Sequence, residues 1–143
     1  MWLAAHPERW LPLIDHAAGT RRLLDHSPDE QVWLLSWLPG QGTGVHDHGP
    51  ASGAFAVAAG TLTEHVAGSS RAGTPRQLDA GRARAFGPHY VHELANTGTI
   101  PAVSVHVYTP EPFAMSVSST GWGPAAPADP AGVQLTDTAV CGW

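Results

Sequence analysis

The sequence predicts an all-β fold, a small β-barrel or jelly roll, preceded by a short helical segment. Two observations carry this prediction. From residue 20 onward, short runs of Leu, Val, Trp and Phe are separated by Gly, Pro and Asp, which is typical of an antiparallel barrel. Only the first 19 residues space their apolar side chains as a helix does. The chain of 143 residues fits a single domain with a sizeable core.

The helical segment is expected over residues 7–18. Trp10, Leu13, Ile14 and Ala17 lie at helical spacing, and Gly19 is placed to end the helix. We expect this helix to pack on the outside of the barrel.

The barrel is expected over residues 20–115, as nine strands whose apolar runs are bounded by turn residues. An irregular segment rich in Gly, Pro and Ala follows over residues 116–143. The whole chain, 1–143, is therefore read as one domain. The expected strands are 21–25, 31–38, 44–48, 53–59, 61–66, 76–79, 83–86, 90–95 and 102–109.

Composition excludes several classes of partner. The formal net charge is -5, and the seven basic residues are all arginine without a basic cluster, which argues against nucleic acid and anionic membranes. No apolar run reaches membrane-spanning length, and no cationic segment precedes an apolar one at the start, so we expect a cytoplasmic protein. The single cysteine, Cys141, can form no intrachain disulfide.

Three histidines are the candidate metal ligands. His46 and His48 are two residues apart on a predicted strand, so both imidazoles project from one face. His92, on a later strand, supplies a third ligand. Imidazoles bind Fe(II), Ni(II), Cu(II) or Zn(II), so the ligands alone do not choose the metal. His89, three residues earlier, could be a fourth ligand, a hydrogen-bond donor to a ligand or a plain loop residue.

The glycines around these histidines follow a pattern. The chain reads G-x5-H-x-H-x4-G-x6-G from residue 40 and G-x5-G-x-H-x2-H-x3-N from residue 81. This pair of motifs resembles the signature of the cupin superfamily. Gly53 stands where many cupins carry a glutamate ligand, and Gly87 and His89 stand where Pro and Gly are frequent. The resemblance therefore implies a cupin barrel with a three-histidine site.

A second resemblance lies in residues 101–110, P-A-V-S-V-H-V-Y-T-P, which are similar to a segment of the cysteine dioxygenase family. Ser104, His106 and Tyr108 alternate onto one face of this strand. The likeness runs over about residues 20–115 and includes the strand at 33–37 and the turn at 60–64. Some members cross-link a cysteine to the matching tyrosine, but Gly53 stands at that position here, so no such cofactor can form.

This resemblance implies a non-haem Fe(II) enzyme that adds dioxygen to a small thiol and gives a sulfinic acid. Tyr108 would donate a hydrogen bond near the metal, His106 would orient the phenol, and Ser104 would fix the tautomer of His106. The implied partners are the thiol and dioxygen, with L-cysteine as the favoured substrate. We expect a monomer or a weak homodimer.

A carboxylate on the substrate would need a cation, and Arg21 and Arg22 occupy the strand where the family places its carboxylate-binding arginine. Since side chains alternate along a strand, only one of the two can face the interior. We predict Arg22, because that register also turns Leu24 inward. Gly53, Ala54 and Ala56 are small, which favours a roomy pocket and a substrate larger than cysteine.

Other functions stay open at this point. Within the same chemistry, 3-mercaptopropionate, cysteamine or a thiol-imidazole such as ergothioneine could replace cysteine. A metal-dependent isomerase or hydrolase would be expected to keep a carboxylate ligand. A non-catalytic metal-binding cupin would bind a ligand without turnover.

Overall fold

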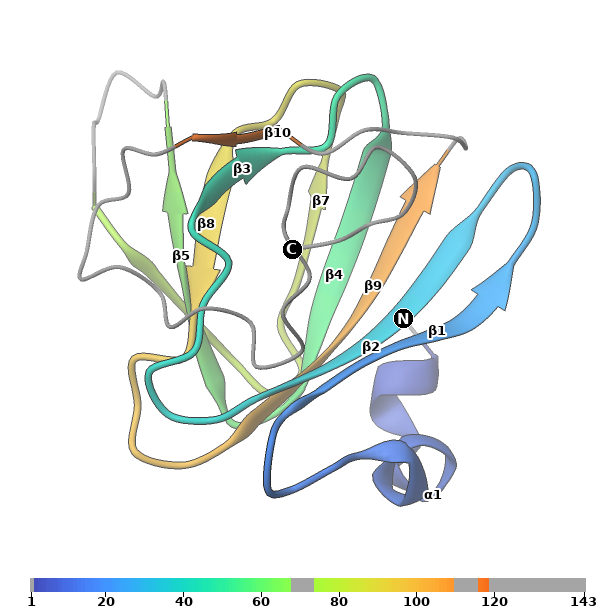
Figure 1. Ribbon diagram of the computed structural model, residues 1–143, viewed down its shortest axis with the longest axis vertical. Coiled ribbons are helices and arrows are strands. Elements are labelled where there is room, and N and C mark those ends of the chain that lie inside the picture. Colours follow the sequence, from blue (N-terminus) through green and yellow to red (C-terminus); the bar gives the residue numbers. More distant parts are fainter. Residues whose placement is uncertain (1, 68–73, 110–115, 119–143) are drawn as a thin grey trace.

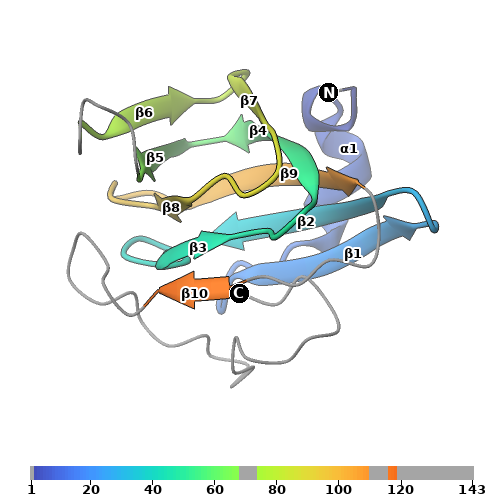
Figure 2. The same cartoon turned by 90° about the horizontal axis from the view of Figure 1, so that it is seen from above.

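The computed structural model describes residues 2–67, 74–109 and 116–118. In these residues two antiparallel five-stranded sheets face each other (Figures 1 and 2). The first sheet has the order β1-β2-β9-β4-β7, and the second has the order β10-β3-β8-β5-β6. The prediction of an all-β fold is confirmed. The strands are β1 (Thr20–His26), β2 (Gln31–Trp37), β3 (Val45–Asp47), β4 (Ser52–Ala59), β5 (Thr61–Val66), β6 (Arg76–Asp79), β7 (Ala83–Phe86), β8 (His92–Ala95), β9 (Ala102–Thr109) and β10 (Ser116–Ser118).

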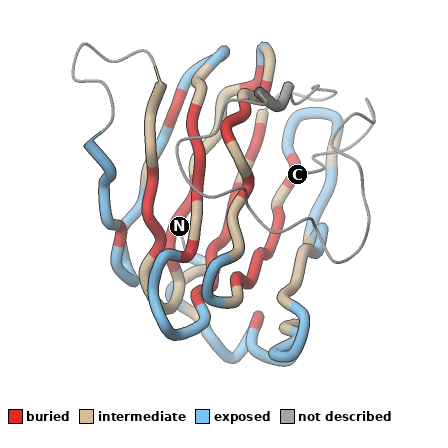
Figure 3. Tube along the Cα trace, turned by 60° about the vertical axis from the view of Figure 1, so that its left-hand side comes forward, coloured by how far each residue is buried: buried red, intermediate tan, exposed pale blue. Residues whose placement is uncertain are grey.

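The core fills the space between the two sheets. Along the strands the buried segments alternate with half-buried ones, and the connecting loops are mostly exposed (Figure 3). Tryptophans at 33 and 37 lie in this core. Its buried members are Trp33, Leu35, Trp37, Ala51, Phe55, Val57, Leu62, Leu78, Phe86, Leu94, Ala102 and Tyr108.

A second, smaller cluster lies on the outer face of the first sheet. Trp10 packs there with Leu34, Val103 and Val105, which point away from the barrel interior. The N-terminal segment thus covers the outside of the barrel, as the sequence predicts (Figure 1).

The predicted helix over residues 7–18 is wrong in length. The α-helix α1 (Pro7–Trp10) gives way to a 3-10 turn, Leu11–Leu13, and Ile14 is already extended. Pro12 explains the early end, because proline has no backbone N–H to donate and its ring clashes with the carbonyl four residues earlier.

Strand assignments from the sequence agree with the structure to within about two residues, with one addition. Residues 116–118, placed by the sequence in an irregular segment, instead form β10, which pairs with β3. The rest of that segment, including Cys141, lies outside the described residues.

Two turns hold the strands that carry the site. Gly60 joins β4 to β5 with φ +69°, and a Cβ there would come within 2.6 Å of the Pro101 carbonyl oxygen, so only glycine fits. Asn96 donates from Nδ2 to the carbonyls of Trp37 and Ile100, at 3.0 and 2.8 Å. The bond to Trp37 ties the loop after β8 to the end of β2. Among the described residues, no helix has the length and apolar character needed to cross a membrane.

Candidate metal centre

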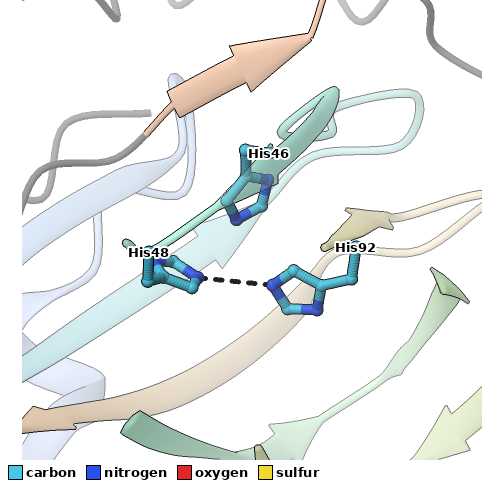
Figure 4. Close-up of side chains that lie close together, drawn as sticks. All are labelled: His46, His48 and His92. Atoms are coloured by element: carbon cyan, nitrogen blue, oxygen red, sulfur yellow. Dashed lines mark hydrogen bonds between the residues drawn. The ribbon is translucent and has the colours of Figure 1, made fainter. Parts of the chain in front are cut away.

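Three histidine side chains converge between the sheets, on the inner side of the second one. His46 lies on β3, His48 follows that strand directly, and His92 begins β8 opposite His46 in the strand register. Their exposed fractions are 3%, 2% and 1%, and one ligand nitrogen from each lies within 4.8 Å of the others. Figure 4 shows the three imidazoles turned toward a common point. The structure therefore brings together all three predicted metal ligands.

The turn after β3 fixes the position of His48. Asp47 accepts a hydrogen bond at Oδ1 from the Gly49 backbone N–H at 2.6 Å, and the Ala51 N–H donates to the His48 carbonyl. His89 lies in the neighbouring turn, with φ 58°, and its N–H donates to the Gly49 carbonyl at 2.7 Å. Its side chain is exposed and stands outside the metal-ligand cluster, so His89 is a turn residue in this structure.

Hydrogen bonds set which ring nitrogen each ligand presents. His46 donates from Nδ1 to the Gly44 carbonyl at 3.0 Å, and His92 donates from Nδ1 to the Glu64 carboxylate at 3.0 Å. Both therefore keep Nε2 free of a proton. Nε2 of His48 lies 3.4 Å from Nε2 of His92, so the lone pair on His92 accepts either a proton from Nε2 of His48 or a cation that both nitrogens share. The donor set fits a divalent metal of the kind that binds imidazole.

Burial keeps His46 and His48 neutral. Desolvation, followed by the repulsion that two protonated rings at His46 and His92 would exert on each other, lowers the pKa of His46 to about 3. Desolvation likewise lowers the pKa of His48, reinforced by His46 and His92. A metal ligand must be deprotonated, so the site is ready to bind a cation at neutral pH.

The second predicted set forms a continuous hydrogen-bonded chain beside the histidines. Ser104 Oγ lies 2.8 Å from His106 Nε2, and His106 Nδ1 lies 3.0 Å from the Tyr108 hydroxyl. Desolvation, followed by the repulsion that protonated rings at His92 and His46 would add, lowers the pKa of His106 to about 3, so its ring is neutral. The ring of Tyr108 stands 4.6 Å from that of His48, centroid to centroid.

Trp37 gives this chain a direction. Its indole Nε1–H donates to Ser104 Oγ at 2.9 Å, and an indole can only donate. Ser104 is fully buried, and the remaining described partner for its own proton is His106 Nε2. His106 must then donate from Nδ1 to Tyr108, which leaves the hydroxyl proton of Tyr108 for another acceptor. No role for Trp37 was predicted from the sequence.

The small residues on β4, from which a roomy pocket was expected, do not line an open space. Gly53 lies opposite Tyr108 in the register, but Phe86 occupies the space beside it, with ring carbons 2.6 and 2.9 Å from a Cβ built at Gly53. Phe86 also stacks on His48, at 5.2 Å between centroids. Ala54 and Ala56 alternate with Gly53 and point to the outer face of the sheet. Small residues on β4 therefore do not enlarge the site.

The predicted register of β1 is also wrong. Arg22 is exposed and pairs with Leu34, a member of the outer cluster, and Leu24 packs on that outer cluster too. Arg21 pairs with Leu35 of the inner core. Its guanidinium lies 5.5 Å from the ring centroid of Trp33. Arg21, not Arg22, is the arginine on the inner face, whereas a role in substrate binding stays a prediction.

Sequence reasoning missed the residues behind His92: Glu64, which accepts a hydrogen bond from it, and Arg84 and Tyr90, which donate to Glu64. Glu64 was part of the family likeness at residues 60–64 but received no role, and Arg84 and Tyr90 were not singled out. A charged residue at an inward position of a predicted strand was the available signal, since a carboxylate is rarely buried without partners.

The chain is similar to known proteins both in sequence and in fold. The family model of cysteine dioxygenase type I matches residues 4–117. The chain belongs to the cysteine dioxygenase type I family. Among solved structures, an uncharacterized protein with a double-stranded β-helix domain from Klebsiella pneumoniae has a TM-score of 0.62 at 23% identity, covering 74% of this chain and 89% of that one.

A Thermus thermophilus protein has a TM-score of 0.59 at 21% identity, covering 69% of this chain and 90% of its own. Oxalate oxidase in complex with glycolate has a TM-score of 0.61 at 18% identity, covering 72% of this chain and 56% of its own. At such identities these likenesses establish the fold. Family and three-histidine site together identify a metal-dependent cupin.

Proposed function

We propose that this protein is a non-haem Fe(II) thiol dioxygenase that converts a small thiol, L-cysteine in the first place, to its sulfinic acid. The net reaction adds both atoms of dioxygen to sulfur, RSH + O2 → RSO2H, and needs no other reductant. The observation that carries the proposal is the directed chain from Trp37 to Tyr108, which ends beside the three histidines. A site that only stores or senses a metal has no use for such a chain.

His46, His48 and His92 would hold the metal through Nε2. Bound Fe(II) supplies open coordination positions at which a thiolate and dioxygen can meet. Tyr108 would donate its hydroxyl proton to an oxygen atom of substrate or dioxygen, because His106 already donates to the phenol oxygen. Phe86 and Phe55 border this region and exclude water, which strengthens each hydrogen bond inside it.

The substrate carboxylate would be bound by Arg21. This guanidinium is half-buried and lies on the inner face of β1, and arginine offers the paired donors that a carboxylate prefers. Since Phe86 fills the space beside Gly53, the geometry favours a small thiol over a thiol-imidazole such as ergothioneine.

Oxygen uptake by the Fe(II)-loaded protein against a panel of thiols tests the function. The panel contains L-cysteine, 3-mercaptopropionate, cysteamine and ergothioneine, and mass spectrometry of the product measures the gain of two oxygen atoms. We expect rapid sulfinate formation from cysteine. If the protein binds iron in stoichiometric amount and consumes no oxygen with any thiol, the proposal fails and a binding cupin replaces it.

A matched pair of variants tests the arginine. Arg21→Ala should raise KM for the carboxylated thiols by at least about tenfold and leave cysteamine, which has no carboxylate, almost unchanged. Arg22→Ala is the control, because Arg22 is exposed on the other face of the same strand. Equal effects of the two substitutions would contradict the assignment.

The remaining expectations from the sequence stay predictions. They are a cytoplasmic location, a monomer or weak homodimer, and the absence of nucleic-acid and membrane partners. Size-exclusion chromatography with light scattering measures the oligomeric state directly.

A further inference from the structure

A buried carboxylate stands directly behind one metal ligand. Glu64 on β5 is fully buried, and its Oε1 accepts hydrogen bonds from His92 Nδ1 at 3.0 Å and from the Tyr90 hydroxyl at 3.2 Å. Its Oε2 accepts from Arg84 Nε at 3.2 Å. Arg84 reaches Glu64 from β7, a strand of the opposite sheet, so the carboxylate is held from both sheets.

The donors around Glu64 dictate where the protons lie. Arginine is permanently charged and can only donate, and the carboxylate carries no proton to give. His92 must therefore carry its proton on Nδ1, where it meets Glu64, and present Nε2 as a lone pair to the other histidines.

We propose that Glu64 is the positioning residue of this metal centre. It fixes the tautomer of His92. Its negative charge lies behind that ligand and not on the metal itself, and it takes the place of the charge that a glutamate ligand at position 53 would bring. Arg84 and Tyr90 hold the carboxylate so that Oε1 faces the imidazole. This inference rests on the metal-binding part of the proposed function and is independent of which thiol is oxidised.

The substitution Glu64→Gln separates this role from simple packing. Glutamine has the same shape but replaces one acceptor oxygen by an NH2 group that donates. If the amide oxygen faces His92, the NH2 group confronts the Arg84 donor. The amide therefore turns, so that its NH2 group donates to Nδ1 of His92, the imidazole proton moves to Nε2, and the ligand nitrogen is blocked.

Metal affinity is the first readout, measured by competition between the metal-free protein and a chromophoric chelator for Zn(II) alone. We expect Glu64→Gln to raise the dissociation constant roughly 10–100-fold. Glu93→Gln is the matched control, because Glu93 neighbours His92 on β8 but points to the other face, opposite His65. Affinity within twofold of wild type in Glu64→Gln would overturn the proposal, as would an equal loss in Glu93→Gln.

Ring-nitrogen NMR of the metal-free protein is the second readout, and the wild-type protein alone already tests the inference. Long-range proton–nitrogen spectra distinguish the two tautomers, and we expect the Nδ1–H form of His92 in the wild type and the Nε2–H form in Glu64→Gln. A wild-type His92 protonated on Nε2 would refute the inference even if the variant does not fold. Neither readout involves a thiol or dioxygen. Inactivity toward every thiol therefore refutes the proposed function only. The inference about Glu64 is decided by metal affinity and by the tautomer of His92.

Discussion

Mild acid should destabilise the metal-free protein strongly, because the fold holds three imidazoles that cannot accept a proton. His46, His48 and His106 are at most 3% exposed, and burial lowers the pKa of each. In the unfolded chain the same groups bind a proton near pH 6.5. As the pH falls below that value, protons bind the unfolded state and not the folded one. The free energy of unfolding then decreases.

The magnitude follows from linkage. Between pH 7 and pH 5.5 a histidine that titrates near 6.5 when unfolded, and stays neutral when folded, removes about 1.3 kcal/mol of stability. Three such groups remove about 4 kcal/mol, against a total of roughly 5–15 kcal/mol for a small domain. The loss should continue toward pH 3, where His46 and His106 begin to titrate in the folded protein.

Urea unfolding followed by tryptophan fluorescence measures this loss, with a chelator present so that no cation occupies the imidazoles. A slope of about 2 kcal/mol per molar urea would place the midpoint about 2 M lower at pH 5.5 than at pH 7. His46→Gln should reduce the pH-dependent loss by about a third, whereas His16→Gln, at an exposed position, should not change it. Stability that is flat between the two pH values would refute the reasoning.

Three further substitutions, the last with a matched control, test the site and the residues packed around it. Tyr108→Phe should keep full iron content and lower kcat about tenfold or more, since a positioned proton donor is lost; equal kcat would remove Tyr108 from the reaction. Trp37→Phe should also keep iron and lower kcat about tenfold, because Ser104 loses the donor that forces it to donate to His106. Wild-type turnover in this variant would contradict the assigned donor order. Gly53→Ala should cost about 1–3 kcal/mol in urea unfolding, because its Cβ would lie 2.6 Å from Phe86, while Gly87→Ala, with open space around it, should cost almost nothing.

Much of the fold could be predicted because its signals are local. Turn residues and period-two alternation located nine of the ten described strands, and the i, i+2 histidines followed from strand geometry. The signal that ends α1 is local too, because Pro12 lies two residues after the helix. The prediction of a helix over residues 7–18 overlooked it.

Other features depend on contacts that sequence spacing does not encode. Whether Arg21 or Arg22 faces inward depends on the strand register against β2, and alternation alone fits either choice. The space beside Gly53 is filled by Phe86, which comes from a strand some thirty residues later in the chain. Glu64 meets His92 and Arg84 only when both sheets are assembled.

The weak attachment of β3 to β8 gives the three histidines a second role, in holding the sheet together. Strand β3 is three residues long. It pairs with β10 over three positions on one edge, but its described pairing with β8 on the other edge is the single register pair formed by His46 and His92. An ion shared by these residues and His48 would fasten the strand to its sheet. The segment should then open and exchange its amide hydrogens faster without metal, while β2 and β9, paired over seven positions, stay closed. Metal binding would thus change the amide exchange of the β3 backbone as well as the environment of the imidazoles.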